Sequence, residues 1–357
     1  MSSKEALQHT QLTAQQVVDD GGYFIEHFKI EADPTKDTPD FLAALEQLNP
    51  RFQGGRDLVR WELENDPTEW DEKTKGIVMD ASKSYRMLEK ETPLVGFYDL
   101  AVILGGARQS NLDRARFAAQ AVSNGNAVVL NMIVGGSNRE LNESEQTNVA
   151  NYALGAVDEY DLCAAAARSI GREYPGIVMS PLFVPEPKAG TPRIIERAIE
   201  AHTVRGKLPK NTGIAAVTTQ IYQVSTGIDL SRVAKEKGVT VPTFTAGNPS
   251  DPEVMAKRTI ATYLSENLRT LRAAANYLEF EQKQTNDLLE KTEAKVAQLV
   301  AEGSTVLNQS SDGAILVEND NGDRTMIEPD GRTWTQYSSI SGLTYNGPDD
   351  LLGEYPE

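Results

Sequence analysis

The middle of this 357-residue chain alternates apolar runs with helix-like segments. The apolar runs occupy residues 97–106, 126–136, 176–184, 213–222 and 239–247. The helix-like segments between them occupy residues 110–125, 158–171, 192–206 and 229–238. Buried strands that alternate with helices are typical of a parallel sheet with both faces covered. We therefore predict an α/β, Rossmann-like domain over residues 96–250, with a doubly wound, mostly parallel sheet of about five strands.

The flank that precedes this domain is polar and helical in spacing. Within residues 1–95, we expect helices over residues 38–48, 56–66 and 69–91, and Pro93 ends the pattern. The flank shows no catalytic grouping, and we interpret it as an N-terminal helical extension that packs on the α/β domain.

The flank that follows the domain is predicted to be one long helix over residues 251–302, a segment with no glycine and a proline only at Pro252. A 4-3 spacing produces a heptad seam of these residues: Leu264, Leu268, Leu271, Ala275, Leu278, Gln282, Thr285, Leu289, Thr292, Val296 and Leu299. We expect its first half to pack on the α/β body. Its second half is predicted either to form a coiled coil with another chain, giving a homo-oligomer, or to fold back on the N-terminal helices.

The end of the chain, residues 303–357, is predicted to be a small antiparallel β tail. Its apolar and polar residues alternate, and Asn321-Gly322 and Asp330-Gly331 are turn signals, so we expect a three-stranded meander. The tail holds ten acidic and two basic residues, so it carries −8 of the whole chain's formal charge of −17.

The composition excludes several functional classes. An acidic chain with a pI near 4.8 is repelled by nucleic acids and anionic membranes. The lone Cys163 and only three histidines disfavour a disulfide framework and a metal centre. We find no apolar run of about 18 residues and no signal-peptide pattern, so we expect a cytoplasmic protein without membrane insertion.

Two of the predicted strands end in paired glycines, which allow a ligand to approach the backbone. The loop of Gly105 and Gly106 continues with Arg108 and Asn111 into a helix that carries Arg114. The loop of Gly135 and Gly136 continues with Arg139. Neither loop has the spacing of a dinucleotide fingerprint or a Walker loop. Together they predict a pocket for a small anionic or nucleotide-like molecule, with the arginines binding phosphate or carboxylate oxygens.

Further candidates lie beyond these two loops. Thr218 and Gln220 end the strand that starts near residue 213, and their hydroxyl and amide groups are suited to ligand contact. Acidic candidates are Glu143, Glu145 and Glu159, although acids in a first helical turn also simply complement the helix dipole. We interpret Cys163 as a small core residue.

The order of these motifs resembles the SanA/YdcF-like family of bacterial proteins of poorly defined function. The resemblance covers about 150 of the 357 residues. The matching positions are Gly105, Gly106, Arg114, Ala115, Gly135, Gly136, Val217, Thr218 and Thr219, with Thr191 and Glu196 as a further segment. Glu143, Glu145 or Glu159 would supply the family's acidic position. Tyr222 stands near the place where the family usually has a histidine.

The resemblance implies a Rossmann-like domain, and family members have been linked to S-adenosylmethionine binding and to envelope maintenance. Our first hypothesis is therefore a small-molecule-binding protein for a nucleotide-like or S-adenosylmethionine-like ligand. An alternative is a hydrolase or transferase acting on a phosphorylated or glycosylated metabolite. A further alternative is an oligomeric scaffold that uses the long helix and the β tail.

Overall fold

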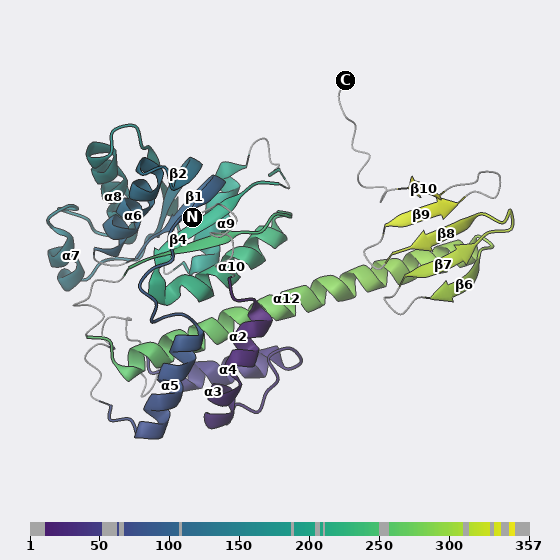
Figure 1. Ribbon diagram of the computed structural model, residues 1–357, viewed down its shortest axis with the longest axis horizontal. Coiled ribbons are helices and arrows are strands. Elements are labelled where there is room, and N and C mark those ends of the chain that lie inside the picture. The colour runs from purple at the N-terminus through teal and green to yellow at the C-terminus, as the bar shows by residue number, and fades with distance from the viewer. Residues whose placement is uncertain are drawn as a thin grey trace. The chain divides into compact units, whose positions relative to one another are not determined.

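The computed structural model describes residues 11–51, 63, 68–106, 109–186, 189–203, 208–209, 211–249, 257–309, 314–328, 332–336 and 343–346. These residues form two compact units, and the boundary between them along the chain falls after Leu278. The first unit contains the α/β domain and the N-terminal helices, and the second contains the antiparallel sheet (Figure 1).

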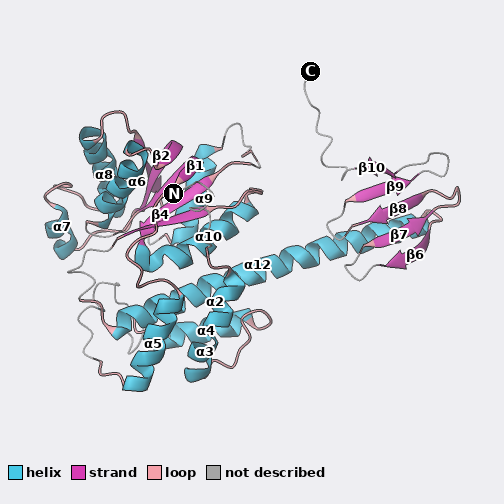
Figure 2. Ribbon diagram, viewed as in Figure 1, coloured by secondary structure: helices cyan, strands magenta, loops and turns pink. Residues whose placement is uncertain are grey.

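The first unit has the predicted parallel sheet, in the order β3-β2-β1-β4-β5 (Figure 2). Its strands are β1 (Gly96–Leu104), β2 (Ala127–Ser137), β3 (Met179–Val184), β4 (Ile214–Thr219) and β5 (Phe244–Asn248). All four pairs of neighbouring strands are parallel, with Leu104 opposite Gly135 and Thr219 opposite Asn248. The predicted fold class, including the number of strands, is confirmed.

Helices cover both faces of this sheet, as its apolar strands require. These helices are α6 (Ser110–Ser123), α8 (Glu159–Glu173), α9 (Thr191–His202) and α10 (Gln223–Glu236). The short helix α7 (Glu143–Val149) joins a separate core cluster with Leu162 and Ala165 of α8. One core cluster joins Ala101 and Ile103 of β1 to α6 and α8, and another joins Leu100 and Val102 to α9 and α10. Burial of both strand faces explains the unbroken apolar runs in the sequence.

A further core cluster of the first unit lies among helices. It joins α2 (Ala14–Asp20), α3 (Gly22–His27), α4 (Thr38–Leu48) and α5 (Glu72–Ser84) to α10 and to the start of α12 (Ile260–Ala301). Leu264, Leu268 and Leu271 of the predicted seam are buried there. The N-terminal helices and the start of α12 therefore form a helical layer that packs on α10.

Two helix boundaries differ from the prediction. The helix expected over residues 69–91 ends at Ser84, and Arg86 follows with a φ of +56°. A left-handed residue of this kind interrupts helical geometry although the apolar spacing continues. The long helix starts at Ile260 in the described chain, and residues 251–256 of the prediction lie outside the described residues. The helix predicted over residues 56–66 also lies outside them, apart from Leu63.

The second unit holds the end of α12 and an antiparallel sheet in the order β10-β9-β8-β7-β6. The strands are β6 (Thr305–Gln309), β7 (Ile315–Glu318), β8 (Arg324–Ile327), β9 (Thr333–Gln336) and β10 (Leu343–Asn346). Val317 and Ile327 are buried, and Thr292 of α12 donates a hydrogen bond to Glu328 O at 3.5 Å. The end of α12 therefore packs within this unit.

The predicted three-stranded meander corresponds to β7, β8 and β9, and β6 and β10 are additional strands. All of β6 is exposed, so it lacks the alternation that marks a half-buried strand. Gly322 has a φ of +80°, as the predicted Asn321-Gly322 turn requires, whereas Asp330-Gly331 lies outside the described residues.

Among the described residues, no helix is long and apolar enough to span a membrane.

Candidate functional site

The three predicted ligand loops leave the same edge of the sheet, because the carboxyl ends of parallel strands lie together. The strand order reverses between β1 and β4, and this reversal is where open α/β sheets bind ligands. Gly105 donates its N–H to Gly135 O at 2.7 Å. Gly135 and Gly136 were predicted to begin a loop, but they are buried inside β2, where they pair with Leu182 and Phe183 of β3. The loop of Gly105 therefore lies directly against the end of β2.

Three of the four paired glycines are required by close packing. A Cβ on Gly105 would collide with Gly135 O, and one on Gly135 would stand 2.5 Å from Ile194 Cγ2. A Cβ on Gly136 would stand 2.7 Å from Cys163 Sγ. Only Gly106 has room, with its nearest neighbours at 3.3 Å. Packing between strands and helices thus explains the glycine pairs without a ligand.

The first loop is closed by Asn111, whose side chain is fully buried at the start of α6. Its Oδ1 accepts the N–H of Gly106 at 3.0 Å, and its Nδ2 donates to Gly106 O. Cys163 Sγ lies 3.4 Å from Asn111 Oδ1, and burial raises the pKa of this thiol far above its usual value. Asn111 therefore shapes the loop, and Cys163 is the core residue that the sequence predicted.

Arg114 connects the two strands that flank the reversal of strand order. Its Nη1 donates to the main-chain oxygens of Leu104 at 2.7 Å and Gly105 at 2.6 Å, and its Nε donates to Thr219 Oγ1 at 3.1 Å. Its guanidinium carbon also lies 5.9 Å from the ring centre of Tyr222. These contacts position the ends of β1 and β4, a role that the sequence-based assignment to anion binding did not include.

Arg139 lies between two glutamates at the end of β2. It donates two hydrogen bonds to Glu145, at 3.0 and 3.1 Å, and one to Glu159 at 2.9 Å. Ser137 Oγ donates to the other carboxylate oxygen of Glu159 at 2.6 Å. The Glu145 side chain is fully buried, and that of Glu159 is 14% exposed. One guanidinium thus faces two carboxylates, so this cluster carries a net negative charge.

The third loop begins a short 3₁₀ helix, η3 (Gln220–Tyr222), which leads directly into α10. Thr218 is buried inside the sheet. Gln220 is also buried, packs over Gly247 and donates its Nε2 to Arg86 O at 3.2 Å. Tyr222, at the position where a histidine was expected from the resemblance, also lies 5.4 Å from the guanidinium carbon of Arg269 on α12.

The remaining candidates do not join these contacts. Arg108 lies outside the described residues. Glu143 is exposed in the first turn of α7, away from the buried pair formed by Arg139 and Glu145. Thr191, the further segment of the resemblance, accepts a hydrogen bond from Arg269 at 2.8 Å.

Sequence reasoning missed Arg269 and Asn248 as residues of this edge. Arg269 belongs to a helix that starts after the α/β domain ends, and its heptad spacing indicated only packing. Asn248 ends the fifth predicted strand, and its position at a strand's carboxyl end was the available signal.

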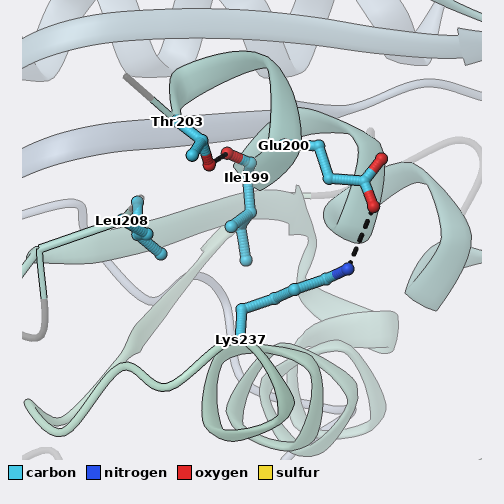
Figure 3. Close-up of a pocket in the computed structure, with 5 residues that line it drawn as sticks. All are labelled: Ile199, Glu200, Thr203, Leu208 and Lys237. Atoms are coloured by element: carbon cyan, nitrogen blue, oxygen red, sulfur yellow. Dashed lines mark hydrogen bonds and ion pairs between the residues drawn. The ribbon is translucent and has the colours of Figure 1, made fainter. Parts of the chain in front are cut away.

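A cavity of about 400 Å³ lies elsewhere. It is lined by Ile199, Glu200, Thr203, Leu208 and Lys237, and Lys237 Nζ lies 2.9 Å from Glu200 (Figure 3). Glu200 and Lys237 stand at the C-terminal ends of α9 and α10, and helices of such a sheet end at its amino edge. This cavity is therefore separate from the candidate site.

In the described chain, no group of three or more His, Cys, Asp or Glu side chains is placed to hold a metal ion. Comparisons with family models, curated proteins and solved structures find no match to this chain. The resemblance to the SanA/YdcF-like family therefore stays a hypothesis.

Proposed function

We propose that this protein binds a small nucleotide-like or S-adenosylmethionine-like molecule at the carboxyl edge of its parallel sheet. The observation that carries the proposal is the reversal of strand order between β1 and β4, beside the hydrogen bond that joins the loop of Gly105 to Gly135 at the end of β2. Sheets of this order bind nucleotides at that place. The resemblance to the SanA/YdcF-like family favours the same class of ligand.

The cluster of Ser137, Arg139 and Glu159 is suited to the sugar part of such a ligand. In dinucleotide-binding sheets, a carboxylate near this edge accepts hydrogen bonds from ribose hydroxyls. Here Glu159, the first residue of α8, accepts the hydrogen bond of Ser137 at the end of β2. Glu159 is held in place by Ser137 and Arg139, so its carboxylate has a fixed orientation. Because the carboxylate is already ordered, less side-chain entropy is lost when a ligand binds.

The test is isothermal titration calorimetry with adenosine, AMP, ATP and S-adenosylmethionine. We expect at least one of them to bind, and Glu159→Gln to weaken binding about tenfold, since a charged acceptor contributes roughly 1.5–3 kcal/mol. Glu143→Gln is the matched control, because Glu143 is an exposed acid at the start of the neighbouring helix α7. Absence of binding by all four compounds would overturn the proposal.

The hydrogen bond of 2.6 Å from Ser137 to Glu159 favours a second candidate, a hydrolase or transferase with Glu159 as general base. Its substrate would be a phosphorylated or glycosylated metabolite. Turnover that is lost in Glu159→Gln, with an unchanged circular dichroism spectrum, supports this activity. Unchanged turnover after replacement of Glu143, Glu145 and Glu159 in turn excludes it.

The course of α12 favours a third candidate, an oligomeric scaffold. This helix of 42 residues belongs to both units, and Gln282, Thr285 and Leu289 of its seam are exposed. Light scattering on the full chain tests this function, because a monomer at all concentrations contradicts it.

A further inference from the structure

Asn248 is the last residue of β5, and its side-chain amide oxygen, Oδ1, is buried without a hydrogen-bond donor among the described residues. The residue is only 5% exposed. Burial of a polar group without a partner is costly, so native structures retain such groups chiefly where a water, an ion or a ligand completes them.

The orientation of this amide is determined by its own nitrogen. Asn248 Nδ2 donates to Pro249 O at 3.2 Å, and an oxygen in the same place would face another oxygen. The atom without a partner is therefore the acceptor Oδ1. It requires a donor, such as an amine or a hydroxyl group.

The position of Asn248 places it beside the proposed site. Asn248 is the register partner of Thr219, and side chains of paired residues in adjacent strands share one face of the sheet. Thr219 accepts the hydrogen bond of Arg114, so this is the face that α6 covers. Neighbouring strands lie about 4.8 Å apart, which puts Asn248 next to the reversal of strand order.

Gln220 provides an informative contrast. Its Oε1 also lacks a donor among the described residues, but Gln220 packs against the face of β5 on which a Cβ of Gly247 would lie. Because successive residues of a strand face opposite sides of the sheet, the Asn248 side chain lies on the other face. Gln220 thus faces away from the loop of Gly105, whereas Asn248 faces the side of Arg114.

The charges around this edge favour a ligand group that donates a hydrogen bond over an anionic ligand group. Arg114 uses three of its N–H groups on Leu104, Gly105 and Thr219. Arg139 is bound to two carboxylates. A phosphate at Arg139 would have to displace two carboxylates, whereas an amine or hydroxyl group would complete an acceptor that lacks a donor among the described residues.

We propose that Asn248 is a specificity-determining residue of the nucleotide-like site, where its Oδ1 accepts a hydrogen bond from an amino group of the ligand. This inference rests on the proposed function. It narrows the ligand class to amine-bearing nucleosides that are held by their base and sugar more than by phosphate.

The experiment compares adenosine with purine riboside, which is the same nucleoside without the amino group, and with AMP. Calorimetry on the full chain is expected to show adenosine binding about tenfold more tightly than purine riboside, and AMP binding no more tightly than adenosine. Asn248→Leu should remove the difference between adenosine and purine riboside, because leucine has the same branched shape without an acceptor.

Thermal unfolding without ligand provides a second readout. Asn248→Leu is expected to raise the melting temperature, since it removes a buried polar atom without a partner. Asn267→Leu is the matched control: Asn267 is fully buried, but it accepts from Ser82 Oγ at 3.1 Å and donates to Val78 O at 2.9 Å. This control should lower the melting temperature.

The outcomes separate the two proposals. If no nucleoside or nucleotide binds, the proposed function fails and this inference fails with it. If they bind but adenosine and purine riboside bind equally, or Asn248→Leu preserves their difference, only the inference on Asn248 is overturned. A lower melting temperature for Asn248→Leu, with unchanged binding, would assign Asn248 to an internal water and also overturn the inference.

Discussion

The loop after β1 and the loop after β2 begin with the same sequence pattern and differ in what their arginines contact. Each has two glycines at a strand end, and arginine residues follow. Arg114 donates to neutral oxygens of Leu104, Gly105 and Thr219, whereas Arg139 is bound to two carboxylates. The comparison teaches that a glycine pair indicates close packing, while the partners of a nearby arginine depend on elements far away in the chain.

The largest expected effect comes from removal of each arginine. Arg139→Met leaves the buried Glu145 carboxylate without its guanidinium, so we expect the free energy of unfolding to fall by about 3–5 kcal/mol. Arg114→Met removes hydrogen bonds to neutral oxygens, and we expect a smaller loss of about 1–3 kcal/mol. Urea unfolding at pH 7 measures both variants.

The double variant Arg139→Met/Glu145→Gln provides the control. Replacement of the unpaired Glu145 carboxylate by an amide should recover part of the lost stability, because the buried charge is removed. Equal losses in Arg114→Met and Arg139→Met would show that the carboxylates do not distinguish the two loops.

The next effect separates the two glycines of the first loop. Gly105→Ala places a Cβ against Gly135 O, a backbone atom that cannot move alone, so we expect a loss of about 3 kcal/mol. Gly106→Ala has 3.3 Å to the ends of two side chains and should cost less than about 1 kcal/mol. Similar unfolding midpoints for the two variants would argue against the packing explanation of the glycine pair.

The next effect is on the pH dependence of the free energy of unfolding, and it concerns Asp229 of α10. This buried acid contrasts with Glu145, which is paired with Arg139. Burial raises the pKa of Asp229 to about 6, although the positive charges of Arg269 and Arg232 oppose the shift. Because the folded pKa lies above the unfolded one, the stability contributed by Asp229 is complete below about pH 4 and is lost as the pH rises through about 6.

Asp229→Asn should therefore be more stable than the unaltered protein by about 3 kcal/mol at pH 8 and nearly equal to it at pH 4. Unfolding free energies measured across this range give the difference directly. A difference that does not change with pH would refute the role of Asp229.

The smallest effect is expected at Glu143, the exposed acid near the second loop. Glu143→Ala should change the free energy of unfolding by less than about 0.5 kcal/mol, as is usual for exposed positions. A loss as large as that of Arg139→Met would mean that Glu143 also belongs to the cluster of Arg139 and Glu145.

The sheet was predictable because burial on both faces leaves a direct mark on each strand. The runs at residues 97–106 and 126–136 correspond to β1 and β2 within a few residues. Strand β6 and the end of α5 were not predictable in this way. An exposed edge strand needs no apolar alternation, and the turn at Arg86 leaves the apolar spacing intact.

The location of the candidate site could be predicted from the sequence, but the contacts between its side chains could not. The positions of Gly105, Gly135 and Thr218 at strand ends predicted loops at one edge, because all strands of a parallel sheet end there. The partners of Arg139 and the packing of Asn111 over Gly106 depend on side-chain geometry in three dimensions. Spacing in the sequence does not contain that information.

By itself, the sequence determined the class of the sheet, the edge at which its loops meet and the need for glycine at the strand ends. These properties follow from local patterns of burial and backbone freedom. Only the tertiary structure decided that Arg139 meets two carboxylates and that Asn248 has a buried acceptor with no donor in the described part of the chain. Such pairings join residues from separate elements, and their energies depend on burial and distance, which arise only when the chain has folded.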